Sequence, residues 1–87
     1  IAGFVEDIPL QIQRLKEYIK NGDSLAAERQ AHTIKGASAN ISGEGLRVIA
    51  HEIEKESKKG NLKAVENLVG ELEIQFEQLK VELKSNF

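Results

Sequence analysis

Apolar residues recur at helical spacing along nearly the whole 87-residue chain, and this periodicity constrains the fold more than any other feature. The pattern is interrupted at three places that carry glycine beside other turn-forming residues: Asn21-Gly22-Asp23, Ser42-Gly43-Glu44-Gly45 and Gly60-Asn61. These interruptions divide the chain into four predicted helices. Because each connection is short, consecutive helices should run antiparallel, which predicts an all-α fold, an antiparallel up-down four-helix bundle.

The first predicted helix has a stripe of branched aliphatic residues at helical spacing: Ile8, Ile12, Leu15 and Ile19. Pro9 has no backbone N–H, so a position deep in the helix would lose a hydrogen bond, and we expect Pro9 in the first turn. Phe4 and Val5 would then belong to a lead-in segment or to a separate short turn.

The other three helices have apolar stripes of the same period. The stripe of the second is mostly small: Ala27, Ala31, Ile34, Ser38 and Ile41. The third presents Leu46, Ile49, Ala50 and Ile53. The fourth, which starts near Asn61 and is long enough to extend past its partners, presents Val65, Leu68, Leu72, Phe76, Leu79 and Leu83. Asp23 can cap the second helix and Ser42 the third, where Glu44 suits the N-terminal dipole.

The length supports one domain with one core, so we treat residues 1–87 as a single helical domain. The chain has no methionine and begins with Ile1, which suggests a piece of a longer protein. It also has no cysteine, which excludes a disulfide framework and a thiolate metal site.

No apolar run approaches the roughly 20 residues that span a bilayer. The net charge is −2 with acids and bases interspersed. We therefore expect no nucleic-acid partner and no direct membrane contact.

His32 is the residue of the second helix that most suggests chemistry. At about 100° per residue, Ile34 lies roughly 160° from His32 around the helix, so His32 faces solvent if Ile34 faces the core. Four residues lie within about 60° of His32 on the same face: Glu28, Lys35, Gly36 and Ala39. A neutral imidazole is a competent nucleophile near pH 7, and a hydrogen bond to its second nitrogen can orient it.

The neighbours of His32 suit a phosphoryl group and a docking partner. Gly36 costs roughly 1 kcal/mol against alanine in a helix interior, and with Ala39 it leaves a low surface against which a partner can press. Lys35 supplies a positive charge that could reach a phosphoryl group on the imidazole. Each feature also has an ordinary explanation, since most surface histidines are only solvated and a helical glycine can permit close packing. However, Gly36 lies well over 100° around the helix from the buried stripe, whereas a glycine that permits close packing would lie on it.

The run from His32 to Ser38 resembles the signature of histidine-containing phosphotransfer (HPt) domains, a histidine followed at +3 and +4 by Lys35-Gly36 and then small residues. The resemblance continues through Asn40-Ile41, Leu46 and residues 50–54. It implies an intermediate of a two-component phosphorelay. Such a domain takes a phosphoryl group from the aspartate of a receiver domain, holds it as phosphohistidine and passes it to another receiver.

Carried over by position, the resemblance makes His32 the phosphoacceptor, Lys35 the partner of the phosphoryl charge and Gly36 the residue that clears the way for the receiver. Glu28 and Ala39 share this docking face. Family members often place a polar side chain of the next helix against the other ring nitrogen, and Glu54 occupies that position. Where relatives commonly have Gly-Ala after the Asn-Ile pair, this chain has Ser42-Gly43, so the turn is expected to differ.

The resemblance also has implications for cofactors, enzymatic activity, partners and location. We expect no cofactor and no metal of its own, because the receiver partner would bring Mg²⁺ and the acidic pocket. The domain would have no kinase activity, and whether it counts as an enzyme is a matter of definition. A response-regulator receiver is the expected partner of a monomeric domain. A cytoplasmic location follows, either free or as the cytoplasmic part of a membrane-anchored sensor such as a hybrid histidine kinase.

Two other functions fit an exposed histidine on a helix. One is the dimerisation and phosphoacceptor region of a histidine kinase, although such regions usually have an acidic residue where this chain has Thr33, and they pair two helices per chain. The other is a helical adaptor without phosphoryl chemistry. His51 has the surroundings of a solvated residue, and a metal site formed by His32 and His51 would need a third ligand that nothing in the sequence nominates.

Overall fold

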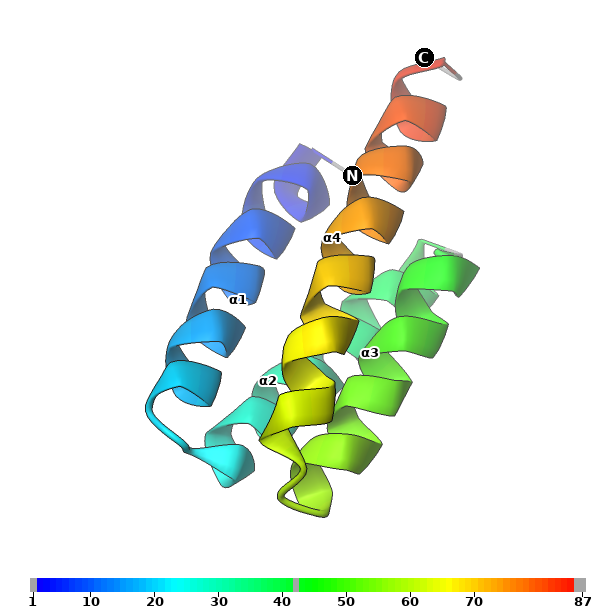
Figure 1. The fold of residues 1–87 in the computed structure, drawn as a ribbon. Coiled ribbons are helices and arrows are strands. Elements are labelled where there is room, and N and C mark those ends of the chain that lie inside the picture. Colours follow the sequence, from blue (N-terminus) through cyan, green and yellow to red (C-terminus); the bar gives the residue numbers. More distant parts are fainter. Residues whose placement is uncertain (1, 42, 86–87) are drawn as a thin grey trace.

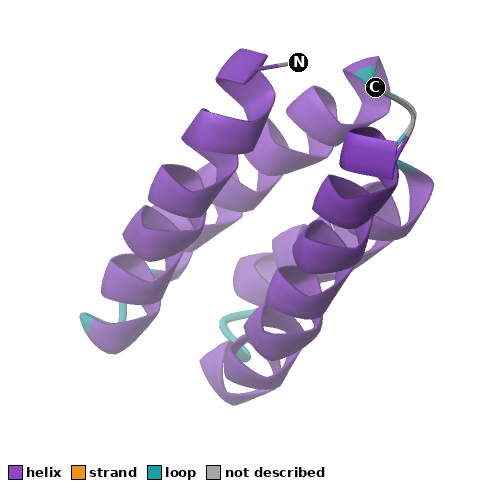
Figure 2. Cartoon of the chain, turned by 90° about the horizontal axis from the view of Figure 1, so that it is seen from above, coloured by secondary structure: helices purple, strands orange, loops and turns teal. Residues whose placement is uncertain are grey.

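The computed structural model describes residues 2–41 and 43–85, which form four helices joined by short turns (Figure 1). The helices are α1 (Ala2–Lys20), α2 (Ser24–Asn40), α3 (Glu44–Lys58) and α4 (Leu62–Ser85). They lie side by side along one direction, as the view from above also shows (Figure 2). The prediction of an all-α, up-down four-helix bundle is confirmed. The C-terminal end of α4 extends past the other helices, as its length predicted.

Each helix turns one apolar stripe toward a common core. In α1 and α4 this stripe is built from large side chains, whereas α2 and α3 contribute alanine and serine as well. The buried residues of α2 are Ala27, Ala31, Ile34 and Ser38, and those of α3 are Leu46, Ala50, Ile53 and Ser57. The Ser38 hydroxyl donates to the Ile34 carbonyl at 2.7 Å, so this buried polar group has a partner. The small residues allow α2 and α3 to pack closely, and these two helices carry the candidate site.

The start of α1 differs from the sequence prediction. The helix begins at Ala2, so Pro9 lies in its interior and Phe4 and Val5 are helical. Phe4 packs against Phe76 of α4, with ring centroids 6.3 Å apart. An interior proline costs roughly 3 kcal/mol. Phe4 is only partly buried, so its packing against α4 and its ring pair with Phe76 offset part of this cost.

Of the two predicted N-terminal caps, the one of α2 is present and the one of α3 is not. Asp23 caps α2, because its carboxylate accepts from the Ala26 N–H at 3.1 Å. The N-cap of α3 is Gly43, which has no side chain, so the prediction that Ser42 is this cap is wrong, and Ser42 itself lies outside the described residues. A Cβ on Gly43 would lie 3.1 Å from Leu79 Cδ2. Glycine therefore lets the turn pack against α4 at the expense of a capping hydrogen bond.

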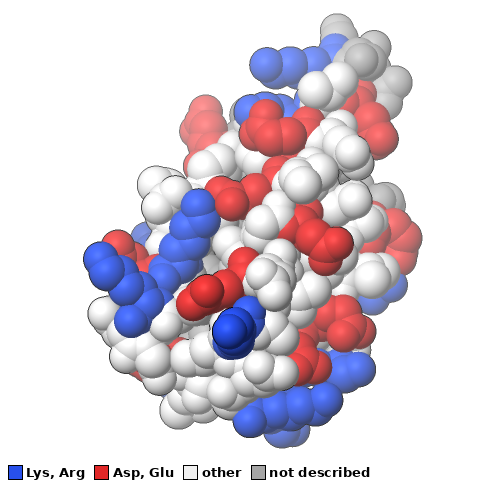
Figure 3. Space-filling view, in the orientation of Figure 1, with Lys and Arg blue, Asp and Glu red and all other residues white. Residues whose placement is uncertain are grey.

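The surface of the bundle mixes charges of both signs. Acidic and basic side chains alternate over the face shown in Figure 3. Several of them form pairs within one helix, such as Glu44 with Arg47 at 2.7 Å in the first turn of α3, where an acidic residue was predicted. None of the helices in the described part of the chain combines the length and the apolar character that crossing a membrane requires.

Candidate functional site

His32 stands at the middle of α2 with its ring directed outward. Its side chain is 67% exposed, whereas Ala31 and Ile34 beside it are fully buried. The helical period predicts this arrangement, since the core stripe of α2 lies on the opposite side from position 32. A solvent-facing imidazole on a rigid helix is accessible to a second protein without any change in the fold.

Glu54 of α3 lies against one nitrogen of this ring. Its Oε2 is 2.9 Å from His32 Nδ1, and the Glu54 side chain is only 19% exposed. A carboxylate can only accept a hydrogen bond, so Nδ1 carries the proton and donates. The neutral ring then has its lone pair on Nε2, the nitrogen that does not face Glu54. The structure thus brings His32 and Glu54 together in a way that leaves Nε2 as the nucleophilic atom.

Lys35 contacts the other oxygen of the same carboxylate. Its Nζ lies 2.6 Å from Glu54 Oε1 in a short ion pair. Burial raises the pKa of Glu54, but the contacts with Lys35 and His32 together outweigh burial and hold this pKa below its ordinary value. Glu54 is therefore ionised near neutral pH and joins His32 to Lys35.

The face of α2 around His32 is low in relief. Gly36 and Ala39 are exposed, and Glu28, one turn before His32, is half-buried. A Cβ built on Gly36 would meet nothing within 4 Å, so contacts inside the bundle do not require glycine there. The structure brings all three residues onto the His32 side of α2, as the helical period predicts.

Leu25 is a residue of this face that the sequence reasoning missed. It is 55% exposed and lines a hollow of about 360 Å³ together with Glu28, Arg29, His32, Thr33 and Glu54. Seven residues are nearly two full turns, so the position of Leu25 relative to His32 could have shown that the two share a face. An exposed leucine beside the imidazole offers apolar contact to a docking partner.

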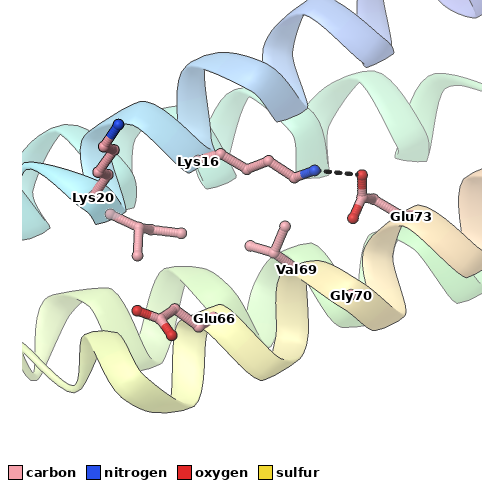
Figure 4. A pocket seen from close by; sticks show the side chains of 7 residues that line it. Lys16, Lys20, Glu66, Val69, Gly70 and Glu73 are labelled. Atoms are coloured by element: carbon pink, nitrogen blue, oxygen red, sulfur yellow. Dashed lines mark hydrogen bonds and ion pairs between the residues drawn. The ribbon is translucent and has the colours of Figure 1, made fainter.

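Two further features lie apart from this cluster. His51 is exposed on α3, and among the described residues no group of three or more histidine, cysteine, aspartate or glutamate side chains is placed to hold a metal ion. A separate groove of about 370 Å³ runs between α1 and α4, where Lys16 pairs with Glu73 at 2.7 Å beside Gly70 (Figure 4). None of the predicted site residues lines this groove.

Comparison with known proteins identifies the family. No curated protein and no solved structure matches the chain significantly. A family model described as the Hpt domain matches residues 1–82, which include α1, α2, α3 and most of α4. The match therefore covers α1, α2 and α3 in full and α4 up to residue 82. The chain belongs to the Hpt family, the histidine-containing phosphotransfer domains of two-component signalling.

Proposed function

We propose that this domain is a phosphorelay intermediate that accepts a phosphoryl group on His32 from the aspartyl phosphate of one receiver domain and passes it to the aspartate of another. The observation that carries the proposal is the exposed His32 ring whose Nδ1 contacts Glu54 at 2.9 Å. This contact fixes the tautomer and points a lone pair on Nε2 toward an incoming protein.

The transfer step follows from this geometry. The Nε2 lone pair attacks phosphorus, and the bond between phosphorus and the aspartate oxygen breaks with its electron pair left on that oxygen. The aspartate becomes a carboxylate again. The ring keeps its proton on Nδ1 and gains a positive charge, which faces the Glu54 carboxylate. Transfer to the next receiver is the same step in reverse, so no proton has to leave or enter the site.

The other residues of the site either supply positive charge to the phosphoryl group or leave space for the receiver to approach. Lys35 supplies positive charge to the phosphoryl group on His32, one helical turn away. Gly36, Ala39 and Glu28 form the surface over which the receiver approaches. Close approach matters because a misplacement of about 1 Å can slow such a reaction on the order of a hundredfold. The receiver contributes Mg²⁺ and its acidic pocket, and the domain needs no cofactor of its own.

The setting of the domain follows from this role. Its partners are response-regulator receivers in the cytoplasm, and a hybrid histidine kinase is one parent chain that suits it. The domain works as a monomer, because the four apolar stripes bury one another within a single chain. A kinase dimerisation region would instead share its core between two chains, so the single-chain core favours the relay function.

The two histidines of the chain provide a direct test. His32→Gln should abolish acid-labile phosphorylation by a phosphorylated receiver or by phosphoramidate. The matched variant His51→Gln should be phosphorylated like the wild type. Circular dichroism should show both variants folded, because both side chains are exposed. Acid-labile phosphate on the His32→Gln variant, or its loss from the His51→Gln variant, would refute the assignment.

A further inference from the structure

Lys35 is already paired with a carboxylate when no phosphoryl group is bound to His32. In the resting structure its ammonium group is 2.6 Å from Glu54 Oε1, and the Lys35 side chain is only 26% exposed. The other oxygen of this carboxylate contacts His32 Nδ1, so Lys35 is held on the Nδ1 side of the ring. A phosphoryl group would instead be bonded to Nε2. The lysine that should serve the phosphoryl group is thus already paired with another anion.

We propose, on the basis of the proposed phosphotransfer function, that Glu54 and the phosphoryl group on His32 compete for Lys35, so that Glu54 limits how strongly the domain retains phosphate. Glu54 then has two separate effects. Through Oε2 it positions the imidazole, and through Oε1 it withholds Lys35 from the phosphoryl group.

The chemistry of the groups gives this exchange its direction. A phosphoryl group carries a charge of nearly −2 and three strong acceptor oxygens, whereas a carboxylate carries −1. Lys35 should therefore move to the phosphoryl group once it is attached. Glu54 keeps a partner after the exchange, because the phosphorylated ring still holds a proton on Nδ1 and gains positive charge. The exchange therefore leaves no isolated carboxylate between α2 and α3.

Lys35 has the freedom that the exchange requires. It lies three residues after His32 on the same helix, so its backbone is already one turn from the ring. Its ammonium group stands on a flexible stem of four methylene groups, and rotation about these bonds can redirect it while the helix stays in place.

The competition can be measured on the domain after treatment with phosphoramidate, which needs no receiver. A ³¹P NMR titration gives the ionisation constant of the phosphoryl group, and a stronger contact with Lys35 favours its dianion. Glu54→Gln keeps an oxygen that can accept from Nδ1 but removes the charge that holds Lys35. This variant should raise the ionisation constant by about two- to fivefold, the range of one exposed ion pair.

A double-mutant cycle separates competition from direct repulsion between Glu54 and the phosphoryl group. In a Lys35→Met background, the effect of Glu54→Gln should largely disappear. An equal effect in both backgrounds, or none in either, would overturn the proposal. Glu73→Gln is the matched control, because it breaks the Lys16–Glu73 pair between α1 and α4 and should leave the ionisation constant unchanged (Figure 4).

A second readout needs no variant at Glu54. The ¹⁵Nζ resonance of Lys35 should shift when phosphoramidate phosphorylates the wild type, and an unmoved resonance would overturn the proposal. The two hypotheses fail in different ways. A wild-type domain that takes no phosphate on His32 would refute the proposed function itself. A domain that is phosphorylated while Lys35 stays with Glu54 would refute only the competition.

Discussion

Gly36→Ala should stabilise the domain, because nothing in the bundle requires a glycine at this position. The residue is exposed in the interior of α2, and an added Cβ meets no atom within 4 Å. Alanine in a helix interior is more stable than glycine by roughly 0.5–1 kcal/mol. For a domain of this size, 1 kcal/mol shifts the Tm by about 4–8 °C. The Tm measured by circular dichroism should therefore rise by about 2–8 °C.

A larger side chain at Gly36 should separate stability from function. Leucine is a good helix former, so Gly36→Leu should keep the wild-type Tm or exceed it. Its side chain would nevertheless stand one turn from His32, where the receiver has to approach. Displacement by about 1 Å should slow phosphotransfer from a receiver on the order of a hundredfold. Phosphoramidate is small, and it should still phosphorylate His32 at the wild-type rate.

Gly70 offers a matched control on another face. It too is exposed in the interior of a helix, and a Cβ there would also meet nothing within 4 Å. It borders the groove between α1 and α4 (Figure 4). Gly70→Ala and Gly70→Leu should therefore leave transfer unchanged. A Gly36→Leu variant with a lowered Tm would show that Gly36 serves packing, and one that transfers at the wild-type rate would show that the receiver docks elsewhere.

Three further predictions concern the neighbours of His32. Lys35→Ala should slow transfer about tenfold in quench-flow assays, because a charge-assisted contact of roughly 1–3 kcal/mol is partly offset by the ion pair with Glu54 that Lys35 gives up. The lowered pKa of Glu54 stabilises the folded state above its ordinary value of 4.5, and this contribution is lost as the pH falls through the lowered pKa. Urea unfolding between about pH 3 and pH 6 should therefore show a smaller loss of stability in Glu54→Gln than in the wild type. Leu25→Ser should weaken receiver-dependent transfer without changing phosphorylation by phosphoramidate, and its free energy of unfolding should stay within about 0.5 kcal/mol of the wild type.

Features set by a single helix could be predicted from the sequence. The opposite orientations of His32 and Ile34 follow from the turn of one helix, and the structure has them as predicted. The cap at Asp23 is equally local, since its carboxylate bonds a backbone group three residues away. In each case the geometry of a single helix is sufficient, because it fixes the relative positions of residues a few places apart.

Features that depend on contact between helices escaped the sequence reasoning. Pro9 lies inside α1, and the helical turns before it include Phe4, which packs against Phe76 of the last helix, far along the chain. The turn before α3 has Gly43 at the cap position, where a Cβ would come within 3.1 Å of Leu79 Cδ2 on α4. Tertiary packing overrides a local rule in both places.

The link between His32 and Lys35 through Glu54 depends on the spacing of two helices and on side-chain rotamers. A family resemblance suggested the position of Glu54 near the ring. The helical period of α3 does not indicate that Oε1 of Glu54 would reach Lys35. The side chains of Lys35 and Glu54 are 19 residues apart in the sequence and meet only because α2 and α3 pack closely. The small residues in the buried stripes of these two helices allow this close packing.

The central position of His32 has a kinetic consequence for the proposed relay. Eight residues of α2 precede His32 and eight follow it, and the helix is about 25 Å long. The bundle measures 19 Å across each short axis. A typical interface covers about 800 Å² on each partner, so one receiver centred on His32 would occupy nearly the entire face of α2 and α3. Donor and acceptor would then visit in turn, and the phosphohistidine must outlast the interval in which neither is bound.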